Sequence, residues 1–171
     1  MNFTDKIKNF KRGPAIILPK DIGLVIALTG INRDSVAVDA GTGSGFMAAY
    51  LANICKKVIT YENREEFFNI AKKNLAEFEN VKLKFKDVYK GIQEKNLDLI
   101  ALDLKEPWKV FKHAEKSLKQ GGFLFSYLPT INQIEIIIEK LKKNKFKLVK
   151  VVELIEREWE TDGRIRPKSR M

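Results

Sequence analysis

The chain has 171 residues, about the length of one domain, and 44% of them are hydrophobic, which excludes wholesale disorder. No apolar stretch reaches the roughly 20 residues that a membrane-spanning helix needs, and no signal peptide is visible at the N-terminus. The single cysteine, Cys55, excludes a disulfide framework and a cysteine-built metal site, so we expect a cytoplasmic protein without a metal.

Basic residues outnumber acidic residues by 32 to 22, which gives a net charge of +10 and predicts attraction to polyanions. The excess lies in residues 1–20, 139–150 and 163–171. The lysines of 139–150 are equally typical of a solvated helix face. In the last segment, Arg164 and Arg166 carry planar guanidinium groups that suit phosphate, so nucleic acid is the expected partner. An anionic membrane surface ranks below it, because no basic amphipathic helix is evident.

Strand-like and helix-like runs alternate along the chain. The expected helices span residues 21–28, 44–53, 63–78, 108–119 and 134–141. The expected strands span residues 35–40, 57–62, 81–85, 97–102, 123–128 and 146–155. Asn63 is the predicted N-cap of the helix over 63–78, with Glu66 completing a capping box. This order predicts an α/β fold with a doubly wound, mostly parallel sheet and helices on both faces. Its ligand site is expected outside the carboxyl ends of the strands.

A glycine-rich loop, Asp39-Ala-Gly41-Thr-Gly43-Ser44-Gly45, joins the first strand to its helix. Such a loop permits a tight turn and lets a ligand reach backbone N–H groups, although a purely structural turn has the same composition. The dinucleotide-binding pattern needs a further glycine where Phe46 stands. The observed spacing instead resembles the first motif of S-adenosylmethionine-dependent methyltransferases.

Four carboxylates fall at or just after the ends of successive strands: Asp39, Glu62, Asp87 and Asp103. Glu62 stands about 20 residues beyond the glycine loop, where an acidic side chain can accept both ribose hydroxyls. It could also be a surface carboxylate favoured by a helix N-terminus. Asp87 could accept from an adenine amino group, or it could be a plain turn aspartate.

Several spaced motifs make the resemblance more specific. They are Gly13-Pro with Leu18-Pro-Lys-Asp21, Leu102-Asp-Leu-Lys-Glu-Pro-Trp108, Tyr127-Leu-Pro-Thr-Ile-Asn-Gln133 and Arg157-Glu-Trp159. Together, over about residues 12–171, they resemble the archaeal and bacterial tRNA adenine-N1 methyltransferases that modify position 58 of the T-arm. The resemblance implies a seven-stranded Rossmann-like domain, S-adenosylmethionine as cofactor, tRNA as partner and a homotetramer.

The resemblance also implies roles for individual residues. The expected cofactor-binding residues are Asp39, Gly41, Gly43, Ser44, Gly45, Glu62, Asn63, Asp87, Val88 and Asp103. Asp103 is also the expected catalytic residue, where it would hold the target base. The expected substrate-binding residues are Tyr127, Pro129, Asn132, Gln133, Arg164 and Arg166. From the residues alone, Asn132 and Gln133 could equally be exposed helix positions.

The expected chemistry needs no general base, because adenine N1 has a lone pair and no proton to lose. The product base is cationic. A carboxylate at Asp103 that accepts from the exocyclic amino group would orient the base and stabilise the developing charge.

The chain departs from the family at both ends. We expect a basic N-terminal segment over residues 1–13 and the catalytic domain over 14–171. The family's small N-terminal β domain and its last strand are expected to be absent. A small-molecule methyltransferase of precorrin type and a noncatalytic RNA-binding subunit remain alternatives, and methylation of position 57 stays open.

Overall fold

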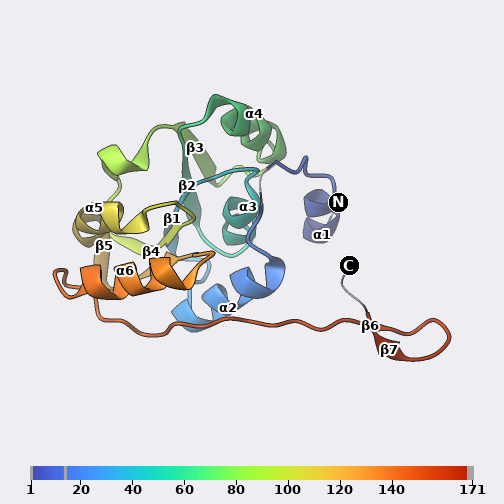
Figure 1. The fold of residues 1–171 in the computed structure, drawn as a ribbon. Helices are drawn as coiled ribbons and strands as arrows, with labels where there is room; N and C mark the ends of the chain where they lie inside the picture. The colour runs from blue at the N-terminus through green and yellow to red at the C-terminus, as the bar shows by residue number, and fades with distance from the viewer. Residues whose placement is uncertain (1, 14, 169–171) are drawn as a thin grey trace.

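A five-stranded parallel sheet forms the centre of the computed structural model, which describes residues 2–13 and 15–168 (Figure 1). The strand order is β3-β2-β1-β4-β5. The strands are β1 (Val36–Ala40), β2 (Lys57–Glu62), β3 (Val81–Phe85), β4 (Leu97–Leu102) and β5 (Leu118–Ser126). These strands confirm the α/β class and the parallel sheet.

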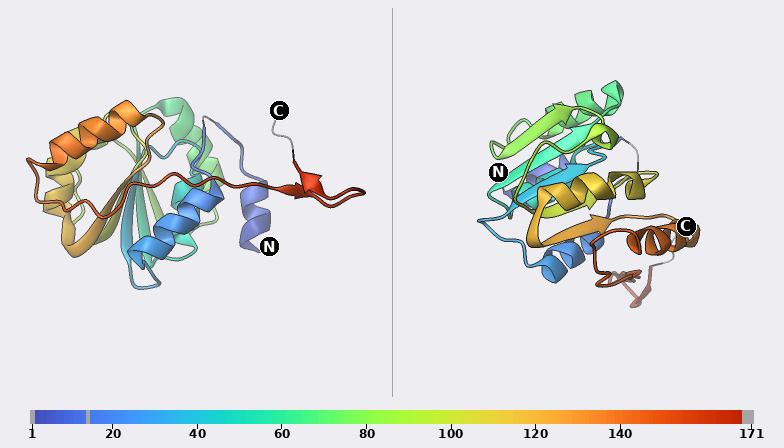
Figure 2. Two further views of the ribbon diagram at one scale, coloured as in Figure 1. Left: turned by 60° about the horizontal axis from the view of Figure 1, so that its bottom comes forward. Right: turned by 90° about the vertical axis from the view of Figure 1, so that its left-hand side faces the viewer.

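Helices cover both faces of the sheet (Figures 1 and 2). The α-helices are α1 (Phe3–Lys8), α2 (Pro19–Thr29), α3 (Phe46–Ala52), α4 (Glu65–Asn74), α5 (Phe111–Ser117) and α6 (Ile131–Leu141). Two short 3₁₀ helices are η1 (Val88–Lys90) and η2 (Pro107–Val110). One apolar core packs α2 and α3 against one sheet face, and a second packs η2 and α5 against the other. The expected helix 134–141 starts earlier, at Ile131.

The chain reverses its direction of winding between β1 and β4. From β1 it passes through α3 and α4 to β2 and β3, whereas β4 leads through α5 to β5 on the other side. Ala40 lies opposite Tyr61 on β2 and opposite Leu102 on β4. The residues that follow these three therefore emerge side by side at the carboxyl edge of the sheet, at the point where ligands bind in open α/β sheets.

The N-terminal residues pack onto this body. Phe10 is buried and its ring lies edge-on to Phe46 of α3, with 5.3 Å between ring centroids. Phe3 contacts Tyr50 in the same way at 5.0 Å. Burial of these aromatic rings fixes the segment against α3.

The expected strand over residues 146–155 is wrong, because this segment is extended without ladder pairing. Its many apolar and β-branched residues are typical of a strand, but a strand also requires a neighbouring backbone. Here Val149 and Ile155 are 73% and 84% exposed. Lys20 of α2 fixes the segment by donating to the Leu154 carbonyl oxygen at 2.8 Å.

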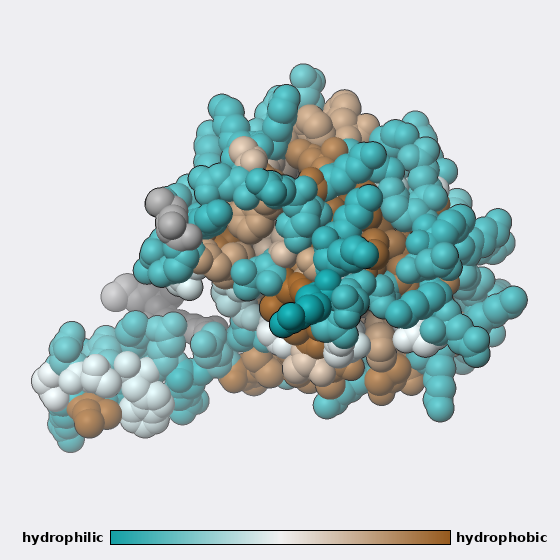
Figure 3. All heavy atoms as spheres, turned by 180° about the vertical axis from the view of Figure 1, so that it is seen from behind, coloured by the Kyte–Doolittle hydropathy of each residue, from teal (hydrophilic) through white to brown (hydrophobic). Residues whose placement is uncertain are grey.

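Beyond it, β6 (Trp159–Glu160) and β7 (Arg166–Pro167) form an antiparallel hairpin that projects from the body (Figures 1 and 3). From behind, the body surface is mostly hydrophilic with separate hydrophobic patches (Figure 3). Among the described residues, no helix is long and apolar enough to cross a membrane.

Several element boundaries differ from expectation, and α4 ends at Asn74 and not near residue 78. The N-cap of α4 is Arg64 and not Asn63. The backbone N–H groups of both residues donate to the Glu62 carboxylate, at 3.0 Å each, before the helix begins. The helix expected to run to residue 119 ends at Ser117, and β5 already begins at Leu118. The glycine pair lies within β5, where Gly121 has a φ of +79° and the register with β4 shifts.

Candidate functional site

A cavity of about 570 Å³ opens at the carboxyl edge of the sheet. This volume lies in the range of small-molecule sites. Eleven residues predicted for the site line it: Gly41, Gly43, Ser44, Glu62, Asn63, Asp87, Val88, Asp103, Tyr127, Pro129 and Gln133. The fold thus brings together residues from the ends of all five parallel strands.

The glycine loop sits against the end of β4. Gly41 has a φ of +90°, and a Cβ placed on it would lie 2.1 Å from the Asp103 carbonyl oxygen. Only glycine fits such a position. The backbone N–H groups of Gly41 and Thr42 donate to the Tyr61 carbonyl oxygen at 3.0 and 3.2 Å. The loop is therefore held by both strands that flank β1.

Glu62 is buried beside the glycine loop with 3% of its surface exposed. Its Oε2 accepts from the Gly43 N–H at 2.9 Å, while Oε1 accepts from the Asn63 and Arg64 backbone and from Arg64 Nε at 3.2 Å. The Arg64 guanidinium also lies over the Phe67 ring, 4.1 Å from its centroid. This shell of donors fixes the orientation of the Glu62 carboxylate in the cavity wall.

Asp39 lies beneath the loop and outside the cavity lining, with 1% of its surface exposed. Thr60 donates its hydroxyl to Asp39 at 2.7 Å, and the Thr42 hydroxyl bonds in turn to Thr60. Since the Thr60 proton points to Asp39, Thr42 is the donor of the second bond. Burial raises the pKa of Asp39 to about 7, helped by the charges of Asp103 and Glu62 and opposed by the Thr60 hydrogen bond.

Asp103 is half-buried in the cavity wall at the end of β4. Within the described part of the chain, its carboxylate accepts no hydrogen bond, although its backbone N–H donates to the Ala40 carbonyl oxygen at 2.9 Å. Burial raises the pKa of Asp103, and the positive charge of Arg64 partly offsets this. A half-buried carboxylate without a donor is suited to accept one from a ligand.

Asp87 and Val88 form the wall beyond β3. Asp87 caps η1 by accepting from the Tyr89 N–H at 2.9 Å, which leaves its second oxygen available. His113 of α5 lies behind this turn, 3.2 Å from the Tyr89 carbonyl oxygen.

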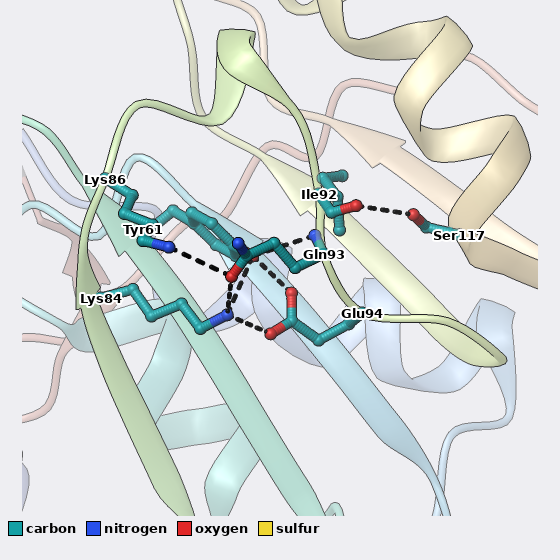
Figure 4. A network of polar contacts seen from close by, with 7 residues as sticks. All are labelled: Tyr61, Lys84, Lys86, Ile92, Gln93, Glu94 and Ser117. Carbon is teal, nitrogen blue, oxygen red and sulfur yellow. Dashed lines mark hydrogen bonds and ion pairs between the residues drawn. The ribbon is translucent and has the colours of Figure 1, made fainter.

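Tyr61, which sequence reasoning missed, joins the cavity wall to a polar network behind it (Figure 4). Its hydroxyl donates to Glu94 and accepts from Lys84 and the Gln93 N–H, each at 3.4 Å. Lys84 also donates to Glu94 Oε1 at 2.5 Å. The network fastens the loop after η1 to β2 and β3.

The remaining wall comes partly from the first turn of α6. Thr130 is its N-cap and exchanges bonds with Gln133, whose side-chain amide also donates to the Lys105 carbonyl oxygen at 3.0 Å. Gln133 is thereby fixed next to the loop after β4. Asn132 is exposed and lies outside the cavity lining.

The two tail arginines do not reach the cavity either. Both are exposed on the β6–β7 hairpin, where Arg166 pairs with Glu160 at 2.8 Å. Gly45 also lies outside the lining, at the N-cap of α3, where its φ is +87°.

Sequence reasoning also missed the wall formed by the N-terminal segment. Ala15, Ile16 and Ile17 line the cavity, and the Gly13-Pro motif with Leu18-Pro-Lys-Asp21 was the signal that pointed to this segment. Other unpredicted lining residues are Thr42, Phe46, Met47, Arg64, Lys86, Tyr89, Leu104 and Lys105. Residues 2–13 and 15–168 contain no group of three His, Cys, Asp or Glu side chains that could hold a metal ion.

Comparison with known proteins identifies the family. Residues 9–169 match the family described as the tRNA methyltransferase complex GCD14 subunit. The chain belongs to this family.

Individual relatives agree with this assignment. The chain is 40% identical to the tRNA (adenine(57)-N(1)/adenine(58)-N(1))-methyltransferase TrmI of Methanocaldococcus jannaschii, over 98% of this chain and 71% of that protein. It is 33% identical to the tRNA (adenine(58)-N(1))-methyltransferase TrmI of Thermus thermophilus, over 89% of this chain and 62% of that protein. The crystal structure of the tRNA (m1A58) methyltransferase TrmI of Aquifex aeolicus superposes with a TM-score of 0.90 at 31% identity, covering all of this chain and 71% of that one.

This member of the GCD14 family matches only part of the length of its relatives. It spans slightly under two thirds of the Thermus protein. The family match begins at residue 9, so it includes the N-terminal wall of the cavity as well as the strand ends.

Proposed function

We propose that this protein transfers a methyl group from S-adenosylmethionine to N1 of an adenine at position 58 of the tRNA T-arm, with position 57 as a second candidate target. The observation that carries the proposal is the place of Asp103 beside the glycine loop. Asp103 is a half-buried carboxylate in the same cavity wall as Gly41 and Gly43. A base held by Asp103 would thus meet a cofactor held by the loop. Membership of the GCD14 family supports the same activity.

The residues present fit the cofactor. The glycine loop enters α3 beside Glu62, whose Oε2 accepts one hydrogen bond from the Gly43 N–H and keeps a lone pair for a ribose hydroxyl. The second oxygen of Asp87 would accept from the adenine amino group, and Val88, which lines the same wall, would contact the adenine. When bound, S-adenosylmethionine supplies an electrophilic methyl group.

Asp103 then acts on the base. By accepting from the exocyclic amino group it would hold adenine N1 in line with the methyl group, and its charge would stabilise the cationic product. Tyr127, Pro129 and Gln133 would form the wall on which the base rests. Because N1 lies on the pairing edge, the target must leave its stack or fold, at a cost of a few kcal/mol.

Further expectations belong to the same proposal. Asp39 supports the loop from below, while Ser44, Gly45 and Asn63 shape it. Asn132, Arg164 and Arg166 lie outside the cavity, where they would contact more distant parts of the tRNA. We also propose a homo-oligomer acting in the cytoplasm, with residues 14–171 as its catalytic domain and 1–13 as a basic N-terminal segment.

The test uses labelled S-adenosylmethionine and tRNA transcripts with and without replacement of the two target adenines. We expect label in the unaltered tRNA and none when both adenines are replaced. Equal labelling of both transcripts would refute the target. Cofactor binding without any RNA labelling would favour a small-molecule methyltransferase or a noncatalytic RNA-binding subunit.

A further inference from the structure

The Asn74 side chain ties the N-terminal segment to the glycine loop. Residues 10–13 and 15–17, here called the strap, run from the core beside α3 to the cavity wall. Asn74, the last residue of α4, lies between the strap and the glycine loop. Its Oδ1 accepts from the Lys11 N–H at 3.0 Å, and its Nδ2 donates to the Lys11 carbonyl oxygen at 2.9 Å and to the Ser44 carbonyl oxygen at 2.8 Å.

These three bonds require an amide. The oxygen faces an N–H group and the nitrogen faces two carbonyl oxygens, so the orientation of the Asn74 amide is fixed by its partners. An aspartate would keep the bond from the Lys11 N–H but would turn a charge toward two carbonyl oxygens. Asn74 itself lies outside the cavity lining, so it acts on the cavity through the segments that it joins.

A second tie lies two residues further along the strap. The Gly13 N–H donates to Ser44 Oγ at 3.0 Å. Ser44 thus accepts from the strap with its hydroxyl oxygen and from the Asn74 side chain with its backbone carbonyl oxygen. A Cβ on Gly13 would lie 3.2 Å from the Phe67 ring, which shows how closely the strap follows α4. Beyond this point, Ile16 and Ile17 form the cavity wall.

We propose that Asn74 is a positioning residue for the cofactor, which holds the strap against the glycine loop so that both walls of the cavity keep their spacing. This inference rests on the proposed function, because it assigns the cavity to S-adenosylmethionine. Loss of Asn74 removes these three bonds and loosens the strap, although the Gly13–Ser44 bond remains. The cofactor must then order the strap when it binds, which lowers affinity.

The experiment compares Asn74→Ala and Asn74→Asp with a matched control at Asn80. Asn80 is also partly buried, and its Nδ2 donates to two carbonyl oxygens, those of Ala52 at 2.8 Å and Cys55 at 3.0 Å, away from the cavity. Asn80→Ala therefore removes comparable bonds without touching the strap. Titration calorimetry with S-adenosylmethionine gives the dissociation constant, and thermal unfolding gives the stability of each variant.

We expect similar losses of thermal stability at both positions but weaker cofactor binding only at Asn74, by about tenfold or more. The KM for the cofactor should rise while kcat at saturating cofactor stays close to that of the wild type. Trypsin should cut after Lys11 or Arg12 more slowly when cofactor is bound to the wild type, and this protection should be lost in the Asn74 variants.

Two results would overturn the inference: cofactor affinity unchanged in a folded Asn74 variant, or an equal loss in Asn80→Ala. If Asn74→Ala does not fold, Asn74→Asp takes its place, because it keeps the bond from the Lys11 N–H and loses the two bonds to carbonyl oxygens. A wild-type chain that binds no S-adenosylmethionine would refute the proposed function itself, which separates the two failures.

Discussion

The carbonyl oxygen of Asp103 occupies the space that a Cβ of Gly41 would need, only 2.1 Å from its ideal position. This contact joins the loop after β1 to the end of β4, the two strands between which the winding of the sheet reverses. The backbone of the proposed cofactor loop is therefore in direct contact with the backbone of Asp103, the proposed base-holding residue.

Gly41→Ala should weaken both stability and cofactor binding. The φ of +90° alone costs a side chain about 1–3 kcal/mol, and the clash with Asp103 adds to it. The control is Gly23→Ala within α2, where a Cβ meets nothing within 4 Å and should stabilise the helix by about 0.5–1 kcal/mol. Urea unfolding of both variants tests this, and equal stabilities would contradict the contact.

Asp103→Ala should lower the rate of methylation by about 10²–10³ and leave the dissociation constant of the cofactor nearly unchanged. Asp103→Asn keeps an oxygen that can accept from the base amino group but removes the charge. Its methylation rate should therefore lie between those of the wild type and Asp103→Ala. Single-turnover assays on tRNA measure these rates. Unchanged turnover in Asp103→Ala would remove the residue from the mechanism.

Asp39→Asn should make stability less dependent on pH. The pKa of Asp39 is raised to about 7, so between pH 4 and 7 the folded chain holds a proton that the unfolded chain has lost. The stability that this proton contributes is fully present below the pKa of Asp39 in the unfolded chain. It is lost as pH rises through this window toward the pKa in the folded chain. The free energy of unfolding of Asp39→Asn, relative to that of the wild type, should be roughly 2 kcal/mol higher at pH 7.5 than at pH 5.

Urea unfolding at the two pH values measures this difference. The exposed Asp34 provides the control, since Asp34→Asn should change stability about equally at both. A gain at position 39 that is the same at pH 5 and 7.5 would contradict the buried, protonated carboxyl.

Tyr61→Phe should destabilise the fold by about 1–2 kcal/mol, because it leaves the Gln93 N–H and Glu94 without their hydroxyl partner. Tyr50→Phe is the matched control, since the Tyr50 hydroxyl makes no hydrogen bond within residues 2–13 and 15–168. Denaturant unfolding should separate the two variants. Equal midpoints would mean that the network in Figure 4 contributes little.

The carboxyl-edge site was predictable because parallel strands end together. Glu62 and Asp103 follow buried apolar runs, and the register that sets Ala40 opposite Tyr61 and Leu102 brings them beside Gly41. Arg64 could not be placed in the same way. Its exposed side chain obeys no periodicity, and only the fold turns it toward Glu62.

The length and composition predicted one domain, the charge predicted attraction to polyanions, and the alternation of strand-like and helix-like runs predicted the α/β class and the five strands of the parallel sheet. Tertiary structure decided the rest. Residues 146–155 carry a strand pattern but lack a neighbouring backbone, since local pattern cannot tell whether a partner edge is available. The link from the strap to the glycine loop through Asn74 joins residues 63 positions apart. Such a link arises only once the sheet has placed α3 and α4 side by side, because its energy comes from hydrogen bonds between distant segments.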